Sequence, residues 1–443
     1  MRWDLAHVAR ICQGRERGGA VVDSVSIDSR TVASGALFVA VIGENHDGHD
    51  FIAEARAAGA AAVVAEAGRL AGGDGVEVAD TVAALRALGI ARRLEITCPV
   101  IGVTGSSGKT TTKDLITAAL GSGAHASPRS FNNEFGVPLT MLGVPDSATA
   151  VVVEVGSRGS GHIAHLGSVI DPDVAVITNV GPAHLEMFGS VEGVIDAKWE
   201  LVSALGPNGM AILPAGDERL LARANGPVLT FGEESDADVE AVGVEIDDTG
   251  RASFELRFRD EVVAIRMPLP GRHQAVNAAA AVAAVVAIGR SFSEAAGRLE
   301  TAAVSPGRME VVTKRWGDGE IIVINDTYNA NPDSMAAALE TVAAMPGRHL
   351  AVLGRMHELG EFEAEAHRQA GALAASLGFS VVAVGDDPGI ADGAGEVASS
   401  VADVAAAVEL LRATIVPGDV VLVKASRAAG LEIVVTELQG DST

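Results

Sequence analysis

Residues 102–112, with the sequence GVTGSSGKTTT, combine glycines, one lysine and several hydroxyl groups at a spacing that suits phosphate binding. Backbone N–H groups of such a loop point inward and cradle phosphate oxygens, and the dipole of the following helix favours an anion. We expect Lys109 to reach the terminal phosphates of a nucleotide and the Thr110 hydroxyl to ligate Mg²⁺. The predicted phosphate-binding residues are Gly105, Ser106, Ser107, Gly108, Lys109, Thr110 and Thr111.

This loop departs from the strict GxxxxGK[ST] spacing, because Val103 stands where the first glycine belongs. Residues 105–110, GSSGKT, form a tighter variant of the motif. The competing interpretation is a glycine-rich turn with an incidental lysine. Even a true phosphate loop does not identify a reaction, because kinases, GTPases, motors and ligases share it.

Two later strands carry side chains that could ligate a metal ion. Residues 151–156, VVVEVG, read as a buried strand with Glu154 at its carboxyl end, where ligands bind in open α/β sheets. Residues 174–184, VAVITNVGPAH, repeat this design with His184 in the turn, and an imidazole beside the phosphate loop could ligate a second ion. The alternatives are a solvated strand end for Glu154 and a surface or packing position for His184. Lys198 alone reads as an ordinary helical lysine.

Short β-rich runs alternate with alanine-rich helical stretches along the chain, which predicts the α/β class. We expect three domains: a small α/β domain over residues 1–97, a central phosphate-loop domain over 98–303 and a C-terminal Rossmann-like domain over 304–443. A strand at 99–103 leads into the phosphate loop, and the central sheet is expected to be mostly parallel. The C-terminal domain holds further strand–helix alternations, at IIVIND, HLAVLG, SVVAVG and DVVLVKAS.

Composition excludes several classes of function. The chain has 443 residues, a net charge of −25 and two cysteines, Cys12 and Cys98. A nucleic-acid partner is not expected, because backbone binding needs clustered lysine and arginine. No apolar run reaches the length of a spanning helix, the N-terminus lacks the apolar core of a signal peptide, and the cysteines fit a reducing compartment. We expect a cytoplasmic monomer without a membrane partner.

The runs TGSSGKTTT, EVG, ITNVGPAHLEMFGS and AKWEL follow one another in an order and spacing that resemble the central domain of the Mur ligases. This resemblance extends over nearly the whole chain and implies ATP and Mg²⁺, with two ions expected. It implies that Thr110, Glu154, His184 and Lys198 hold the magnesium, and that Lys198 is carbamylated by CO₂. A carbamate would replace a cation that repels Mg²⁺ with an anionic ligand. Lys109, His184 and Lys198 are the expected catalytic residues.

Three further segments agree with the resemblance. Residues 271–278, GRHQAVNA, are similar to the family's adenine-contacting stretch, with Asn277 as the amide that reads the base, although Gln274 stands where the family usually has asparagine. In the runs PGRME and NDTYNANP, Arg308 is expected to approach the nucleotide phosphates and Asp326 the nucleotide. The residues expected to line the substrate cleft are Asn132, Asn133, Tyr328, Asn329 and Asn331.

The N-terminal runs SIDSR, GALFVA and GENHDGHDF resemble the domain that binds a UDP-muramoyl-peptide in the enzymes for the last two peptide additions. Arginine and polar turns can bind a diphosphate and uracil. The expected contacts to this substrate are Ser29, Arg30, Asp47, Gly48 and His49.

The C-terminal runs LGRMHELGE and VKASR resemble the family member that adds D-alanyl-D-alanine to a UDP-muramoyl-tripeptide, whereas the DNPR-like run of the third-residue adder is not found. The chain departs from this member at Arg355, where an acidic residue is usual, at Ala425, where glycine is usual, and near Pro214, where an asparagine-containing strand end is usual. These departures leave open a paralogue that works on another substrate.

The implied reaction is formation of an amide. ATP would phosphorylate the terminal carboxylate of the peptide to an acyl phosphate, the amine would attack it, and ADP and phosphate would be released. Lys109 and two magnesium ions would neutralise the charge of the transferring phosphoryl group. Two alternatives stay open: a Mur-ligase paralogue that joins another amino acid or peptide to a different carboxylate, and a phosphate-loop ATPase that acts as a regulator.

Overall fold

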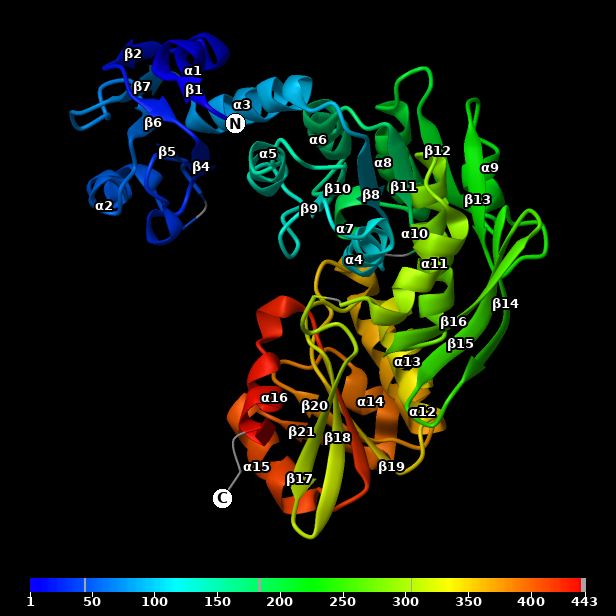
Figure 1. Ribbon diagram of the computed structural model, residues 1–443. Coiled ribbons are helices and arrows are strands. Elements are labelled where there is room, and N and C mark those ends of the chain that lie inside the picture. Colours follow the sequence, from blue (N-terminus) through cyan, green and yellow to red (C-terminus); the bar gives the residue numbers. More distant parts are fainter. Residues whose placement is uncertain (44, 182–184, 304, 440–443) are drawn as a thin grey trace.

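The structure is a computed structural model that describes residues 1–43, 45–181, 185–303 and 305–439. Its elements form three α/β units in chain order, which Figure 1 shows in blue, in cyan to green, and in yellow to red. The central unit lies between the other two, and the C-terminal unit packs below it in this view. Within these ranges, no helix has the length and apolar character needed to cross a membrane.

A five-stranded sheet forms the N-terminal unit, in the order β2-β7-β6-β5-β4 and parallel except between β2 and β7. Its strands are β2 (Arg15–Arg17), β4 (Ser24–Ser26), β5 (Ala36–Val39), β6 (Ala62–Glu66) and β7 (Gly75–Val78). The strands β1 (Trp3–Asp4) and β3 (Val21–Val22) form a separate antiparallel pair. The helices are α1 (Leu5–Cys12), α2 (Ile52–Ala57) and α3 (Thr81–Glu95).

Helix α3 connects the first two units, and Figure 1 shows it running from one toward the other. The Asp80 carboxylate caps its start by accepting the N–H groups of Val82 and Ala83. Near its end, Arg92 donates to the Val144 carbonyl (2.7 Å) of the central unit, and Arg93 donates to the Ile170 carbonyl (2.6 Å). These bonds hold the N-terminal unit against the central one.

A nine-stranded sheet forms the central unit, in the order β16-β15-β14-β13-β12-β11-β8-β10-β9. In this order, neighbouring strands from β14 through β8 to β9 pair in parallel, whereas β14 with β15 and β15 with β16 pair antiparallel. Every residue of β8, β10 and β11 is buried, as expected for strands covered on both faces. The strands are β8 (Val100–Thr104), β9 (Ala124–Ala126), β10 (Ala150–Glu154), β11 (Val174–Ile177), β12 (Met210–Pro214), β13 (Val228–Gly232), β14 (Val239–Ile246), β15 (Arg251–Phe258) and β16 (Glu261–Pro270).

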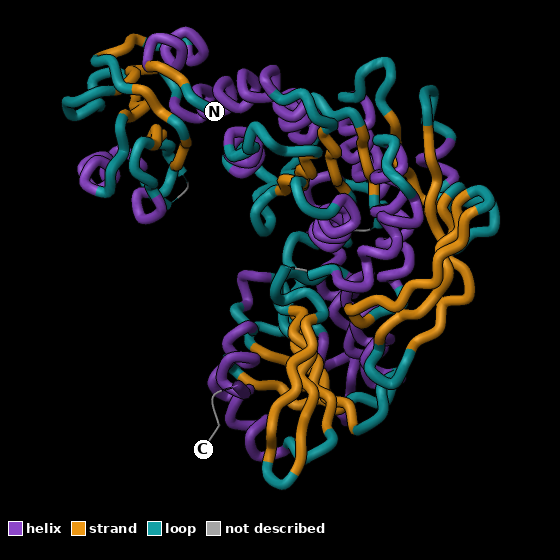
Figure 2. Tube along the Cα trace, viewed as in Figure 1, coloured by secondary structure: helices purple, strands orange, loops and turns teal. Residues whose placement is uncertain are grey.

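Helices cover this central sheet. Helix α10 is almost entirely buried, because its many alanines let it approach both the sheet and α4 closely. Figure 2 shows the long strands β14 to β16 extending beyond the helical layers toward the C-terminal unit. The helices are α4 (Lys109–Leu120), α5 (Gly136–Leu142), α6 (His162–Ile170), α7 (Leu185–Phe188), α8 (Val191–Ser203), α9 (Glu218–Leu221), α10 (His273–Ala287) and α11 (Phe292–Arg298).

The C-terminal unit contains a six-stranded sheet in the order β17-β18-β22-β19-β20-β21, parallel except between β17 and β18. Its strands are β17 (Glu310–Trp316), β18 (Gly319–Asp326), β19 (Arg348–Leu353), β20 (Ser380–Val384), β21 (Ala398–Val401) and β22 (Asp419–Lys424). Its helices are α12 (Pro332–Ala343), α13 (Glu363–Ser376), α14 (Ile390–Ala394), α15 (Val404–Thr414) and α16 (Glu432–Gln439).

The structure confirms the predicted α/β class with its mostly parallel central sheet, and every strand named from the sequence is present. Strand β8 leads into the phosphate loop, and the four predicted C-terminal strands are β18, β19, β20 and β22. The domain boundaries that we propose, after residues 97 and 303, fall between secondary-structure elements.

Candidate functional site

The phosphate loop lies between β8 and α4, and α4 begins at Lys109. Gly108 has a φ of 74°, and a Cβ there would stand 2.9 Å from the Asn277 side-chain oxygen, so both conformation and space favour glycine. The Lys109 ammonium donates to the carbonyl oxygens of Gly105 (2.7 Å) and Ser106 (3.4 Å). The lysine therefore folds back over the loop, and burial lowers its pKa.

Two residues that directly follow the neighbouring strand β11 hold the phosphate loop by hydrogen bonds. The Asn179 side chain accepts the N–H of Ser107 (2.9 Å) and donates to the Ser107 hydroxyl (2.7 Å). The Thr178 hydroxyl donates to the Ser107 carbonyl (2.6 Å). Sequence reasoning did not single out these two residues, although both stand in the ITNVG run.

A buried carboxylate stands next to the loop. Glu154 ends β10 with 1% of its surface exposed, and it accepts hydrogen bonds from the Thr110 hydroxyl (2.7 Å) and the Asn132 amide (2.8 Å). Arg308 donates to the same Thr110 oxygen (2.6 Å) and lies 4.2 Å from the centre of the Tyr328 ring. The Thr110 hydroxyl thus contacts Glu154 and Arg308, and these two side chains in turn contact Asn132 and Tyr328.

Lys198 is fully buried on α8, with 1% of its surface exposed, and its ammonium lies 5.9 Å from the centre of the Phe188 ring. Burial, and to a smaller extent the positive charge of Lys109, lower its pKa to about 7. An amine with this pKa is partly neutral at neutral pH. His184, the third predicted catalytic residue, lies outside the described residues.

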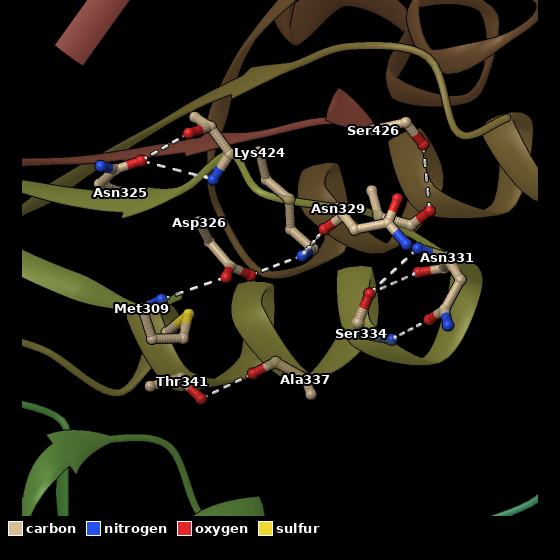
Figure 3. A network of polar contacts seen from close by, with 12 residues as sticks. Met309, Asn325, Asp326, Asn329, Asn331, Ser334, Ala337, Thr341, Lys424 and Ser426 are labelled. Atoms are coloured by element: carbon tan, nitrogen blue, oxygen red, sulfur yellow. Dashed lines mark hydrogen bonds and ion pairs between the residues drawn. The ribbon is translucent and has the colours of Figure 1, made fainter. Parts of the chain in front are cut away.

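The C-terminal unit supplies the opposite wall, which Figure 3 shows in detail. Lys424 ends β22 and pairs with Asp326 at the end of β18 (2.5 Å), while it also donates to the Asn329 carbonyl (3.0 Å). Asn331 caps α12 in a reciprocal arrangement with Ser334, and its amide donates to the Ser106 carbonyl (3.4 Å). This last bond joins the C-terminal wall to the phosphate loop.

These walls enclose a cavity of about 460 Å³. The predicted residues that line it are Ser106, Ser107, Gly108, Lys109, Thr110, Thr111, Asn132, Asn133, Glu154, Asn277, Arg308, Asp326, Tyr328, Asn329 and Asn331. Sequence reasoning missed further lining residues, among them Arg158, His162, Asn179, His273, Asp333, Glu358 and Lys424. Lys424 stands in the VKASR run, so a strand-end signal was present for it.

One end of the cavity carries the residues expected to contact adenine. Asn277 donates to the Gln274 side-chain oxygen (3.1 Å) and accepts a long bond from the Thr112 hydroxyl (3.4 Å). Gln274 also contacts the His273 ring (3.0 Å), and burial lowers the pKa of that histidine. Gln274 therefore orients Asn277 from the position where the family usually has asparagine.

The N-terminal residues do not reach this cavity. The Arg30 side chain is 81% exposed and pairs with Asp28 (2.7 Å), whereas its neighbour Ser29 is buried. His49 is buried and uses both ring nitrogens locally, toward Asp47 (2.7 Å) and the Glu66 N–H (2.9 Å).

Asp47 is the centre of the second N-terminal turn. It accepts the His49 N–H and pairs with Arg69 (2.7 Å), and these partners, the backbone N–H first, lower its pKa to about 2. Gly48 lies against the chain that follows β5, and a Cβ on Gly48 would stand 2.6 Å from the Val41 carbonyl oxygen. Close packing therefore accounts for the glycine at position 48, and local hydrogen bonds account for much of the orientation of the His49 ring.

Comparison with known proteins follows the same division of the chain. Residues 21–101 match the model described as Mur ligase family, catalytic domain; residues 103–285 match the Mur ligase middle domain; and residues 307–427 match the Mur ligase, glutamate ligase domain. The chain belongs to the Mur ligase family, as the sequence motifs predicted.

Two curated relatives carry the same name within that family. The UDP-N-acetylmuramoyl-tripeptide--D-alanyl-D-alanine ligase of Mycobacterium bovis is 38% identical, over 96% of this chain and 93% of the relative. The enzyme of the same name from Escherichia coli K12 is 33% identical, over 99% of each chain.

Solved structures agree with these relatives. A crystal structure of MurF from Acinetobacter baumannii superposes with a TM-score of 0.90 at 31% identity and covers 99% of both chains. The MurF ligase from Thermotoga maritima, in complex with ADP, gives a TM-score of 0.83 at 31% identity over 94% of this chain and 97% of that one. The protein is therefore a ligase that uses ATP, in agreement with the sequence-based expectation.

Proposed function

We propose that this chain joins D-alanyl-D-alanine to a UDP-muramoyl-tripeptide, with conversion of ATP to ADP and phosphate, in peptidoglycan precursor synthesis. One observation carries the proposal: the phosphate loop of the central unit and the strand ends of the C-terminal unit form the two walls of one cavity. The relatives named above carry this activity in their names, and the chain covers them almost from end to end.

The chemistry requires an activated carboxylate, because a carboxylate itself is a poor electrophile. An oxygen of the tripeptide carboxylate attacks the terminal phosphorus of ATP, and ADP leaves. The amine of D-alanyl-D-alanine then attacks the acyl carbon, phosphate leaves, and the nitrogen loses a proton. We expect the Lys109 ammonium, which donates to the Gly105 carbonyl, to turn toward the transferring phosphoryl group and neutralise its developing charge.

The donor set around Glu154 fits magnesium, which prefers oxygen ligands. Glu154 and Thr110 offer a buried carboxylate and a hydroxyl 2.7 Å apart, and we assign the metal to them together with His184 and a modified Lys198. The described residues include no group of three or more His, Cys, Asp or Glu side chains that could hold a metal ion. A bound magnesium ion would supply charge neutralisation at the phosphates.

A carbamate on Lys198 would add the missing oxygen ligands. The neutral amine attacks CO₂, a C–N bond forms, and one proton is released. The lowered pKa of about 7 supports this step, because only the neutral amine has the required lone pair. Burial on α8 supports it as well, since it keeps the group away from bulk water.

The remaining assignments concern the substrates. We propose that Asn277 contacts adenine, that Arg308 and Asp326 approach the nucleotide, and that Asn132, Asn133, Tyr328, Asn329 and Asn331 line the peptide and amine cleft. We also propose that Ser29, Arg30 and the Asp47 turn bind the UDP moiety, and that the protein acts on these small molecules as a cytoplasmic monomer. The exposed guanidinium of Arg30 supports a role in binding a diphosphate.

Mass spectrometry of the products tests the proposal. The enzyme is incubated with ATP, Mg²⁺, D-alanyl-D-alanine and UDP-muramoyl-tripeptide, and each component is omitted in turn. We expect the pentapeptide product and ADP only in the complete mixture. Product from another amine or carboxylate, with none from this pair, would indicate a paralogue. ADP release in the absence of both D-alanyl-D-alanine and UDP-muramoyl-tripeptide would indicate an ATPase regulator.

A further inference from the structure

The segment that leads from the central unit into the C-terminal unit lies along one face of helix α4. We call residues 305–308 the joining segment. At its start, the Ser305 N–H donates to Asp114 Oδ2 (2.8 Å), and at its end the Arg308 guanidinium donates to the Thr110 hydroxyl (2.6 Å). Thr110 and Asp114 are four residues apart on α4 and therefore lie on the same face of the helix. The joining segment is thus fixed to α4 at both ends.

A second segment of the chain, residues 127–130, converges on the same hydroxyl group. The Lys113 ammonium donates to two carbonyl oxygens of this segment, at 2.9 and 2.7 Å. The Ser130 hydroxyl lies 3.3 Å from both the Thr110 oxygen and a guanidinium nitrogen of Arg308. Lys113 therefore holds the backbone that carries Ser130 to this point.

Lys113 and Asp114 also pair with each other. The Lys113 ammonium lies 3.0 Å from Asp114 Oδ1, while the other oxygen of this carboxylate accepts the N–H of the joining segment. The two side chains are 2% and 13% exposed. Such a pair keeps one geometry, because separating it would leave two charges without a partner and away from water. One ion pair on α4 thus fixes two segments that meet at Thr110.

The position of Arg308 depends on this anchoring. Arg308 lines the cavity, and its guanidinium stacks on the Tyr328 ring. The backbone of Tyr328 is bonded to the joining segment, because its N–H donates to the Gly307 carbonyl (3.1 Å). A shift of the joining segment would therefore move Arg308 together with its stacking partner, and Asp114 holds this segment on the central unit ahead of Arg308.

We propose that Asp114, supported by Lys113, is a positioning residue for the reaction: it holds the joining segment on α4, so that Arg308 stands beside the phosphate loop before the nucleotide binds. This inference rests on the proposed function, which assigns Arg308 to the nucleotide. Asp114 lies outside the lining of the cavity, so it acts through Arg308 and not on the substrates. A long side chain whose backbone is already in place loses less freedom when it binds an anion, which increases affinity.

Nucleotide binding in the presence of Mg²⁺, measured by isothermal titration calorimetry, tests this dependence without requiring turnover. Asp114→Ala removes the acceptor of the Ser305 N–H and should raise the Kd for ATP about tenfold, since a hydrogen bond to a charged group contributes on this order. In an Arg308→Ala background, the same substitution should raise the Kd less than about twofold, because the side chain that it positions is gone. The melting temperature should fall equally in both backgrounds.

Asp114→Asn is the conservative variant, and it replaces the alanine variant if that protein does not fold. Its amide oxygen can still accept the Ser305 N–H, although it lacks the charge that pairs with Lys113. We therefore expect a smaller rise in the Kd for ATP, and this rise should again require Arg308.

Asp173→Ala is the matched control. Asp173 also pairs with a cation, Arg93 (3.3 Å), and accepts the N–H of a distant residue, Val100 (2.8 Å). These contacts lie at the start of β8, whereas the phosphate loop follows the end of that strand. The substitution should lower the melting temperature and leave the Kd for ATP unchanged.

An equal rise in the Kd from Asp114→Ala with and without Arg308 would indicate a general structural role and would overturn the inference. An unchanged Kd in the presence of Arg308 would overturn it as well. Both results leave the proposed function intact, because the wild-type enzyme still makes the pentapeptide. If the wild-type enzyme makes no product from UDP-muramoyl-tripeptide and D-alanyl-D-alanine, the proposed function itself fails.

Discussion

The central cavity and the N-terminal surface are both assigned to anionic ligands, but they present their cations differently. Lys109 and Lys424 line the cavity, Lys198 is buried on α8 outside its lining, and burial lowers the pKa of Lys109 and Lys198. On the N-terminal surface, Arg30 is 81% exposed and pairs with Asp28. Buried charge is pre-organised for a transition state, whereas exposed charge mainly contributes to binding. Substitutions in the two regions should therefore affect different kinetic constants.

Lys109→Ala should show the largest effect. Its ammonium donates to two carbonyl oxygens of the phosphate loop, and one pre-organised contact to a transferring group contributes on the order of 10²–10³ in rate. We expect kcat to fall by about this factor, with the melting temperature nearly unchanged. Steady-state ADP release and thermal unfolding measure the two quantities, and near-normal turnover would refute the assignment of the loop.

Lys198→Ala should be nearly inactive, since it removes the proposed carbamate. Short-chain carboxylic acids should restore part of the activity, because they can place an oxygen ligand in the vacated space. Lys198→Arg should not respond to them, because guanidinium keeps the charge and fills the space. A helix-surface lysine would instead change stability by less than about 0.5 kcal/mol and activity little. Normal turnover of Lys198→Ala would rule out the carbamate.

Lys424→Met should destabilise the C-terminal wall by about 3 kcal/mol, because it leaves Asp326 without its buried cation. Adding Asp326→Asn removes the second charge and should recover part of this loss. Urea unfolding of the two variants measures the difference. If the single variant is as stable as wild type, the pair does not hold the wall together.

The pH dependence of Lys198 gives a smaller effect. With a pKa of about 7, lowered by burial from the value of free lysine, the amine is about one tenth neutral at pH 6 and about nine tenths neutral at pH 8. Enzyme depleted of CO₂ and then given limiting bicarbonate should recover activity several-fold faster at pH 8 than at pH 6, after correction for dissolved CO₂. A recovery rate that is independent of pH would contradict a neutral-amine reaction.

The free energy of unfolding should also rise with pH because of the lowered pKa of Lys198. The folded amine binds protons less readily than the unfolded one, so the unmodified enzyme loses stability as pH falls from about 10 toward 7, and little more below that range. Lys198→Met should remove this component of the pH dependence.

Arg30→Ala should show the smallest effect. It removes an exposed substrate contact, so we expect KM for the UDP-substrate to rise a few-fold, with KM for ATP and kcat unchanged. Arg17→Ala is the matched control, because Arg17 is exposed in the same unit and pairs with Glu77. An equal rise in both KM values would argue against a separate UDP site.

Short contiguous motifs predicted which residues of the central unit line the cavity. The phosphate loop, Glu154 and their strands depend on local patterns of glycine, apolar and polar residues, and the structure brings them together as expected. The pairing of Asp326 with Lys424 was not predicted, because the two residues meet only through the parallel pairing of β18 with β22. Periodicity predicts strands but does not give their order in the sheet.

Burial was the second property that the sequence did not reveal. Lys198 and His49 read as polar positions, yet tertiary packing buries both.

Arg355, which replaces an acidic residue, pairs with Glu363 and Asp386 and does not line the main cavity. Ala425 is fully buried, and a Cβ on Gly354 would stand 2.9 Å from its Cβ. Pro214 lines a separate, smaller cavity.

The most direct test of the central claim follows an oxygen atom. UDP-muramoyl-tripeptide labelled with oxygen-18 in its terminal carboxylate is converted with ATP and D-alanyl-D-alanine, and the released phosphate is analysed by mass spectrometry. If the cavity forms an acyl phosphate, each phosphate carries one labelled oxygen, because the carboxylate oxygen that attacked ATP leaves with it. Product formation with unlabelled phosphate would contradict this account of the site.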